Sequence, residues 1–200
     1  MSAQRINLRH YGVALRFLLI ATVVLGIGYP LVVTAIAQVA LPAQANGSLV
    51  SAGGETVGSA LIGQSFTDAN GNALPEWFQS RPSAANYDAT ASGGSNRGPE
   101  NLDLISAIRA RQALIVAGDN VTTSEIPADA VTASASGLDP HISAEYARLQ
   151  VPRVAAARGL PEAQVSELVE SILQSRDLGF LGEPTVNVLD LNIALAETGT

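Results

Sequence analysis

An uninterrupted apolar run stands near the start of the chain, from Phe17 to Leu41 (FLLIATVVLGIGYPLVVTAIAQVAL), and it contains no charged residue. At 1.5 Å per residue a helix of this length measures about 37 Å, enough to cross the ~30 Å hydrocarbon core of a membrane. The pattern therefore predicts one transmembrane helix over residues 17–41. Within it, Gly26, Gly28 and Pro30 would weaken a soluble helix, but small residues let a neighbouring membrane helix approach closely. These three residues are candidate docking positions for such a helix.

The charges that flank this run predict its direction. Arg5, Arg9 and Arg16 precede it without any acidic residue, whereas the next arginine after it is Arg81. Because arginine-rich flanks stay in the cytoplasm, residues 1–16 are predicted to be cytoplasmic and the rest of the chain extracytoplasmic. We therefore expect a single-pass protein of the inner (cell) membrane.

A cleaved signal peptide is the alternative interpretation of the same run. Two tripeptides, Ala35-Ile36-Ala37 and Ala43-Gln44-Ala45, offer the small residues that a cleavage site needs. The apolar region of a signal peptide is usually about 7–15 residues long, however, and this one is much longer. A retained anchor is the interpretation we favour.

The pattern after Leu41 is that of a small exported α+β domain. Residues 42–58 are rich in glycine and other small residues and are predicted to form a linker, and residues 59–200 form the domain. Apolar residues at helical spacing, with helix start and stop signals, alternate with stretches of strand-like apolar alternation. The predicted strands are 57–66 and 186–193, and the predicted helices are 99–116, 140–150, 152–158 and an amphipathic helix around Val165–Leu173.

Composition excludes several classes of function. The chain has no lysine and no cysteine, and its net charge is −7. A Walker nucleotide site needs a lysine, and nucleic-acid binding needs a basic surface, so neither is expected. A zinc site usually needs three or four Cys, His or carboxylate ligands, and His141 is the only histidine after His10. We therefore predict no metal site, no bound cofactor and no nucleic-acid partner.

One stretch, VTASASGLDPHIS (residues 131–143), combines serines with Asp139 and His141. A membrane-anchored hydrolase is one interpretation, but the nucleophile motif G-x-S-x-G is absent, and a catalytic histidine is normally held by a partner from elsewhere in the fold. The other interpretation is that Asp139 caps a helix beginning at Pro140, with His141 in its first turn. The sequence favours the cap, and no residue is predicted to be catalytic.

A second stretch, SGGSN (residues 92–96), could present backbone N–H groups to a small anion. A tightly turned loop is the commoner meaning of such a run. If the anion interpretation held, the chain would be a membrane-tethered exported small-ligand binding protein, which remains the alternative function.

Five blocks follow one another behind the predicted anchor: RPSAANYDATASGGSN, VTASASGLDPHIS, QVPRVAAARGL, LGFLGEP and VNVLDLNIAL. In this order they resemble the KdpC subunit of the bacterial potassium-transporting P-type ATPase complex, over nearly the whole chain. The resemblance implies a non-catalytic accessory subunit whose partners are a potassium-channel-like subunit and a P-type ATPase subunit. It implies that the complex handles ATP and potassium, and that this subunit acts as a catalytic chaperone that raises the ATP affinity of the hydrolysing subunit.

On this interpretation the small-residue loops dock a partner rather than bind a substrate. The candidate docking residues outside the membrane are Arg81, Ser92, Gly93, Gly94, Ser95, Asn96, Ser134, Ser136, Gly137, Asp139 and His141.

Overall fold

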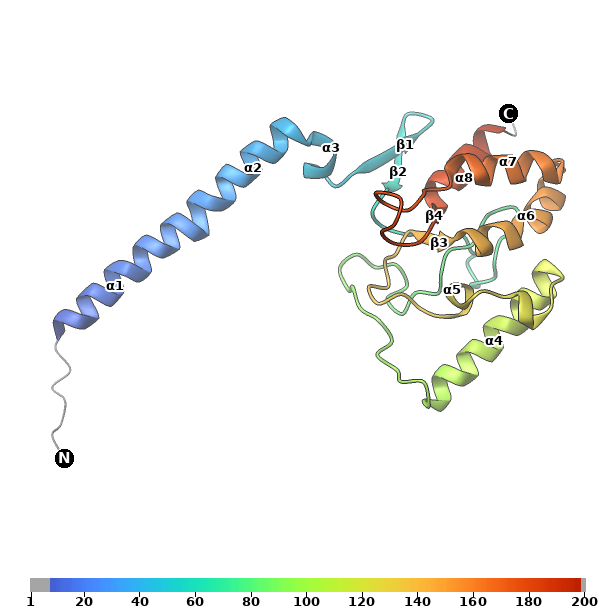
Figure 1. Cartoon of the computed structure of the whole chain (residues 1–200), viewed down its shortest axis with the longest axis horizontal. Helices are drawn as coiled ribbons and strands as arrows, with labels where there is room; N and C mark the ends of the chain where they lie inside the picture. The colour runs from blue at the N-terminus through green and yellow to red at the C-terminus, as the bar shows by residue number, and fades with distance from the viewer. Residues whose placement is uncertain (1–7, 199–200) are drawn as a thin grey trace. The chain divides into compact units, whose positions relative to one another are not determined.

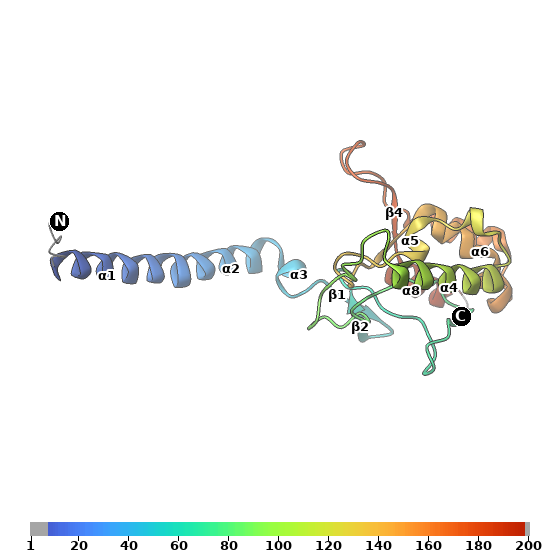
Figure 2. The same cartoon turned by 90° about the horizontal axis from the view of Figure 1, so that it is seen from below.

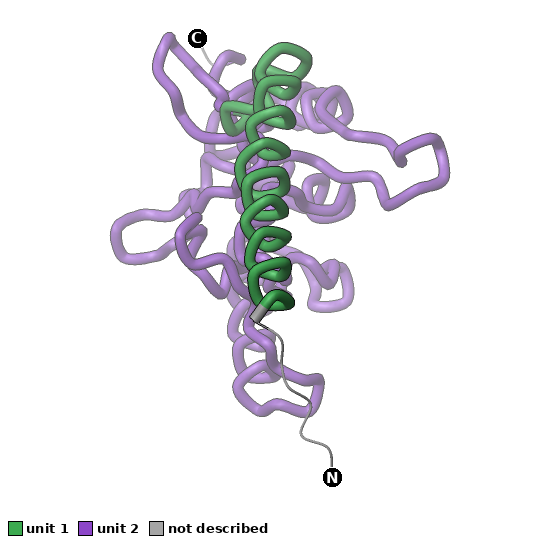
Figure 3. The backbone as a smooth tube through the Cα atoms, turned by 90° about the vertical axis from the view of Figure 1, so that its left-hand side faces the viewer, with its two compact units in different colours: residues 1–48 green, residues 49–200 purple. Residues whose placement is uncertain are grey.

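The computed structural model describes residues 8–198 and consists of two compact units, drawn in different colours in Figure 3. The first unit ends at Ser48 and the second begins at Leu49. The first seven residues of the segment predicted to be cytoplasmic, Arg5 among them, lie outside the described residues.

The first unit is dominated by one long apolar helix (Figure 1). Helix α1 (Leu8–Val23) passes through one π-helical turn, η1 (Val24–Gly28), into α2 (Tyr29–Ala40), and a short helix, α3 (Pro42–Ala45), follows. Among the described residues, Arg9–Ala40 is the one helical stretch long and apolar enough to cross a membrane, and its most apolar window is 0 % buried by protein. This confirms the prediction of an N-terminal apolar helix.

Pro30 explains the π-helical turn. A proline inside an α-helix lacks an N–H group, and its ring collides with the carbonyl four residues earlier, here that of Gly26. Widening the helix by one residue relieves this collision, and the N–H group of Tyr29 accordingly bonds the carbonyl of Val24, five residues back. The sequence therefore widens the helix locally without breaking it.

The second unit begins with a β-hairpin in the region expected to be a linker. Strand β1 (Leu49–Ala52) pairs antiparallel with β2 (Glu55–Ser59), and Gly53 and Gly54 make the turn with φ of +61° and +87°. A two-glycine turn between short apolar stretches is a hairpin signal, and it lies within the linker predicted over residues 42–58. The strand predicted over 57–66 was wrong beyond Ser59.

The body of the second unit is mostly helical. A two-stranded antiparallel sheet, β3 (His141–Ser143) with β4 (Thr185–Asn187), pairs Ile142 with Val186. The remaining elements are α4 (Leu102–Asp119), the 3-10 turn η2 (Thr123–Glu125), α5 (Ala128–Val131), α6 (Ala144–Arg158), α7 (Glu162–Ile172) and α8 (Val188–Thr198). The α+β class is confirmed, with helices contributing most of it.

Helix α6 corrects two predicted helices. Pro152 lies inside one continuous helix instead of separating two, and the helix begins at Ala144 rather than at Pro140. The hydroxyl of Ser143 accepts a hydrogen bond from the N–H group of Tyr146 at 3.0 Å and is the N-cap. Gly159 ends the helix in the left-handed conformation with φ of +66°, as its sequence position predicted.

Helix α8 corrects the predicted strand over 186–193. Only residues up to Asn187 are strand, because the side-chain carbonyl of Asn187 accepts hydrogen bonds from the N–H groups of Leu189 and Asp190. That contact caps a helix. Val188, Leu191 and Leu195 then face the core at helical spacing. The strand predicted from the apolar alternation of this stretch was therefore wrong beyond Asn187.

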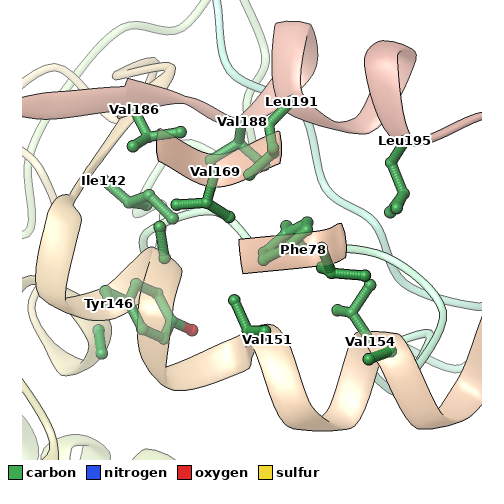
Figure 4. Close-up of a cluster of buried hydrophobic side chains, with 14 residues drawn as sticks. Phe78, Ile142, Tyr146, Val151, Val154, Val169, Val186, Val188, Leu191 and Leu195 are labelled. Carbon is green, nitrogen blue, oxygen red and sulfur yellow. The ribbon is translucent and has the colours of Figure 1, made fainter. Parts of the chain in front are cut away.

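The core lies between α6, α7, α8 and the small β3–β4 sheet (Figure 4). Phe78 is 0 % exposed and fills its centre, although it comes from the irregular segment before α4. Val154 from α6, Val169 from α7 and Leu195 from α8 are each at most 1 % exposed. The amphipathic pattern predicted for α7 is confirmed, because Val165 and Val169 are its buried residues.

Two buried side-chain amides hold the segment that carries Phe78. The side chain of Asn192 accepts a hydrogen bond from the Phe78 N–H group and donates one to the Phe78 carbonyl, both at 3.0 Å. The side chain of Gln150 does the same for Gln79, accepting at 2.6 Å and donating at 3.2 Å. The backbone of Phe78 and Gln79 is thus hydrogen-bonded by side-chain amides on α8 and α6, in the way that the backbone of a neighbouring strand would bond it.

Candidate partner-docking site

The two loops singled out from the sequence lie against each other. The N–H group of Gly93 donates a hydrogen bond to the carbonyl of Ser136 at 2.8 Å, and the hydroxyl of Ser92 donates to the same carbonyl at 3.0 Å. The hydroxyl of Ser83 donates to the carbonyl of Gly137 at 2.6 Å. We call residues 81–96 and 134–141 together the loop pair. These bonds bring together two segments that are far apart in the sequence, since Ser92 and Ser136 are separated by 44 residues.

Glycines permit this close approach. A Cβ atom added to Gly137 would lie 2.7 Å from the carbonyl oxygen of Gly93 and 2.8 Å from the Cβ of Ala85, and its φ of +67° already disfavours a side chain. A Cβ added to Gly94 would lie 2.9 Å from the carbonyl oxygen of Ala135. Gly94 and Gly137 are therefore required for the loops to pack this closely.

Ser134 and Ser136 bond the backbone of their own loop. The hydroxyl of Ser134 accepts a hydrogen bond from the N–H group of Gly137 at 2.9 Å, and that of Ser136 accepts from Leu138 at 3.1 Å. Such local bonds fix a turn. Ser134 and Ser136 thus make the loop rigid.

Asp139 connects the two loops of the loop pair through Arg81, a contact that was not predicted from the sequence. Its carboxylate accepts a hydrogen bond from the His141 N–H group at 3.0 Å and forms an ion pair with Arg81 Nη1 at 3.0 Å. Burial alone raises the pKa of this carboxyl, but its contacts with His141 and the charge of Arg81 outweigh burial and lower the pKa below its ordinary value. The prediction that Asp139 caps a helix at Pro140 was wrong, because residues 141–143 continue as strand β3.

His141 stands beside Asp139 without a nucleophile. Its Nδ1 atom is 3.6 Å from Asp139 Oδ1, too far for a hydrogen bond. The nearest serine in sequence, Ser143, directs its hydroxyl to Asp129 at 2.9 Å. Within the described residues, the contacts of the loop pair assemble no Ser-His-Asp arrangement. His141 belongs to strand β3, so its predicted place in the first turn of a helix was also wrong.

Two residues of this site, Tyr87 and Gly63, were not predicted from the sequence. The phenol of Tyr87 donates a hydrogen bond to the carbonyl of Arg81, and burial raises the pKa of this phenol to about 12. The N–H group of Gly63 bonds the carbonyl of Leu138 at 2.8 Å, and a Cβ on Gly63 would lie 2.7 Å from the carbonyl oxygen of Asp139. Tyr87 thus fixes the backbone of the first loop from within, and Gly63 holds the second loop from a neighbouring segment. The tyrosine within RPSAANY was the available signal, since tyrosine in a polar loop usually packs against something.

The remaining part of the SGGSN stretch lines a hollow. Ser95 and Gly94 border a cavity of about 340 Å³ together with Arg97 and Arg111. Asn96 has a φ of +52° and turns the chain there. Since the Gly93 N–H group is bonded to Ser136, the alternative of an anion nest keeps only part of its donors, and the loop is first of all a packing element.

The membrane candidates Gly26, Gly28 and Pro30 lie in the other unit, around the π-helical turn. A Cβ added to Gly28 would meet only the carbonyl oxygen of Val23 at 3.6 Å, and one added to Gly26 only a methyl group of Thr22 at 3.8 Å. These are ordinary contacts. The helix itself therefore does not require glycine at either position, and any requirement would come from a neighbouring chain.

We expect Asp139→Ala to lower the free energy of unfolding by about 1–2 kcal/mol, because it removes the acceptor of a half-buried N–H group and the partner of Arg81. His141→Ala should cost less than about 0.5 kcal/mol, since its side chain makes no hydrogen bond. Urea unfolding of the full chain in detergent measures both. Asp139→Asn is the control, because it keeps an acceptor for His141. A larger loss for His141→Ala would contradict this account.

Comparisons with known proteins agree with these observations. The family model described as "K+-transporting ATPase, c chain" matches residues 11–197. The "Potassium-transporting ATPase KdpC subunit" of Kineococcus radiotolerans is 53 % identical over 190 residues, covering 94 % of this chain and 93 % of that protein. The protein of the same name from Caulobacter vibrioides is 53 % identical over 191 residues, with the same coverage. That from Caldanaerobacter subterraneus subsp. tengcongensis is 48 % identical over 184 residues, covering 92 % of each chain. The chain belongs to the KdpC family of potassium-transporting ATPase subunits.

Proposed function

We propose that this chain is an accessory subunit of a high-affinity, ATP-driven potassium uptake complex. In this role it stabilises assembly and acts as a catalytic chaperone that raises the ATP affinity of the hydrolysing subunit. Its partners are a potassium-channel-like subunit and a P-type ATPase subunit. The observation that carries the proposal is one apolar helix and a rigid loop pair without assembled catalytic groups, in a chain of the KdpC family.

The division of labour follows from the chain itself. A single membrane helix cannot enclose a pore, and a ring of ion-coordinating carbonyls needs several chains or segments. The chain also has no lysine for a Walker site. Ion transport and ATP hydrolysis therefore fall to the partners, and ATP and potassium are handled by the complex rather than by this subunit.

Orientation determines how the subunit influences ATP binding. Arg9 and Arg16 stand before the apolar run, and no arginine follows it before Arg81, so the proposal places the large unit outside the cell. ATP is not normally present there. An effect on ATP affinity then arises as coupling through the membrane helix, and such coupling is reciprocal: ATP binding strengthens the attachment of this subunit by the same factor.

The orientation predicts the outcome of proteolysis. Trypsin added outside spheroplasts should cut the exported unit at exposed arginines, such as Arg97 with 41 % of its side chain accessible, and should spare a tag before residue 16. Lysed spheroplasts are the control, in which both regions become accessible. Protection of the large unit in intact spheroplasts would reverse the orientation and would make direct ATP contact feasible.

Co-purification tests the function itself. A tagged full-length chain extracted in mild detergent should bring two large membrane subunits with it, and the preparation should show potassium-stimulated ATP hydrolysis. Gly28→Leu should reduce the amount of bound partner while the chain still inserts, because its own helix has room for a side chain there whereas a closely packed neighbouring helix would not. Ala37→Leu, on the same helix, is the matched control. Normal assembly of Gly28→Leu would show that the helix is only a tether.

One observation favours the alternative, a membrane-tethered exported binding protein for a small ligand. Arg97 and Arg111 line the same hollow, and burial together with the charge of Arg97 lowers the pKa of Arg111. A small anion would offset this repulsion. Such a protein would be purified without large membrane subunits, so the same experiment separates the two functions.

A further inference from the structure

A narrow arm stands out from the second unit between α7 and β4. Figure 2 shows this segment, residues 174–185, projecting from the body. Gln174 and Thr185 close its base with reciprocal backbone hydrogen bonds of 2.8 and 3.1 Å, and Asp177 and Leu181 pair near its end with two bonds of 2.9 Å. The arm is therefore a small hairpin-like loop closed by two isolated antiparallel bridges, and it contains the LGFLGEP stretch.

The tip of the arm is apolar and exposed. Leu178 is 83 % exposed, Phe180 69 % and Leu181 49 %. Outside the N-terminal helix, no other four-residue stretch of the described chain exposes three large hydrophobic side chains. Scattered exposed leucines are normal in proteins, but an aromatic and two leucines gathered on a projection are typical of an interaction site.

The tip is held in one shape before anything binds it. Leu178 has a φ of +53°, which is unfavourable for a leucine, and Gly179 and Gly182 have φ of +82° and +75°. The N–H groups of Gly179 and Phe180 bond the carbonyls of Arg176 and Asp177 at 3.1 and 3.2 Å. A projection that is already ordered loses little conformational entropy on binding, so its apolar contacts contribute more to affinity.

The charges on the arm favour a protein surface over a lipid surface. Arg176 is paired with Glu183 across the arm, and Asp177 leaves the arm with a net charge of −1. Segments that bind anionic membrane surfaces carry several lysines or arginines beside their apolar residues. A small, preformed apolar tip without a basic surround fits a neutral, apolar recess on another protein.

We infer that Leu178, Phe180 and Leu181 insert into an apolar recess on the extracytoplasmic face of a partner subunit of the potassium-transporting ATPase complex. This inference rests on the proposed function and adds a specific contact to it. The arm is a second attachment point, separate in the chain from the loop pair and from the membrane helix.

The first test is the double variant Leu178→Ser/Phe180→Ser in the tagged full-length chain, co-purified from membranes in mild detergent. Loss of two central apolar anchors should reduce the partner subunits recovered per chain by about tenfold or more. Leu102→Ser is the matched control, because Leu102 is 80 % exposed at the start of α4 and should leave recovery unchanged. Near-UV circular dichroism of each variant checks that the unit is folded.

The second test identifies what the tip touches. A photo-reactive benzoylphenylalanine replaces Phe180 in intact membranes, and the same group at the position of Leu102 is the control. An adduct with a partner subunit, formed only from the arm, supports the inference. Adducts only with lipid or with a second copy of this chain would overturn it, as would full recovery of partners by the double variant.

The failures of the two proposals are distinguishable. If the wild-type chain brings down no membrane subunits, the proposed function fails and the inference falls with it. If the wild type brings them down and the double variant does so equally, only the arm is excluded as a contact.

Discussion

Replacing Asn192 with leucine is expected to lower the free energy of unfolding of the second unit by about 2–6 kcal/mol. Asn192 is 2 % exposed, and its side-chain amide satisfies both the N–H group and the carbonyl of Phe78 at 3.0 Å. Leucine has the same branched shape but carries methyl groups in place of the amide oxygen and nitrogen, so two buried backbone groups lose their partners at about 1–3 kcal/mol each. Phe78, the centre of the core, is carried by this backbone and would be displaced.

Urea unfolding of the full chain in detergent measures this loss. Ala196→Leu is the matched control, because it adds a leucine to the exposed side of the same helix α8 and should change stability by no more than about 0.5 kcal/mol. A small loss for Asn192→Leu would mean that water or a shifted backbone satisfies Phe78, and that the amide contact is not what fixes this segment.

Replacing Gly137 with alanine is expected to disrupt the loop pair and to cost about 1–3 kcal/mol, from a strained backbone and an overpacked contact. Its φ is +67°, and the new Cβ would lie 2.7 Å from the carbonyl oxygen of Gly93 and 2.8 Å from the Cβ of Ala85. Those contacts are too short to persist, so the two loops must separate. Recovery of partner subunits should fall along with stability if the loop pair docks a partner.

Gly93→Ala provides a close control for this change. Gly93 lies in the facing loop, its backbone is not in the left-handed region, and an added Cβ would have no atom within 4 Å. Its N–H group would still donate to Ser136. The control variant should therefore resemble the wild type in both unfolding and co-purification. If Gly137→Ala lowers stability but leaves recovery of partners unchanged, the loop pair is structural and the docking role is wrong.

Local signals in the sequence were sufficient for several elements. The apolar run over 17–41 predicted the N-terminal helix because a single segment in lipid must satisfy its backbone N–H and C=O groups internally, and a helix does so. The spacing of Val165, Leu168, Val169 and Ile172 predicted α7, and Gly159 predicted the end of α6. In each case one repeated pattern or one conformational requirement pointed to a single structure.

The errors arose where two local signals competed. Asp139-Pro140 has the composition of a helix start, but the carboxylate is occupied by Arg81, 58 residues away, and the cap falls on Ser143. The run after Val186 alternates like a strand, yet Asn187 caps a helix there. Short stretches satisfy both patterns, and contacts with distant segments decided between them.

Composition and spacing alone were enough to predict the N-terminal apolar helix, the α+β class and the two small-residue loops. Only the tertiary structure decided that the two loops meet, because the bond between Gly93 and Ser136 joins segments 43 residues apart by number and no local pattern encodes it. The same holds for the pairing of Asn192 with Phe78, at a separation of 114 residues. Backbone groups that leave helices and strands must find partners somewhere, and packing of the whole chain determines which side chains supply them.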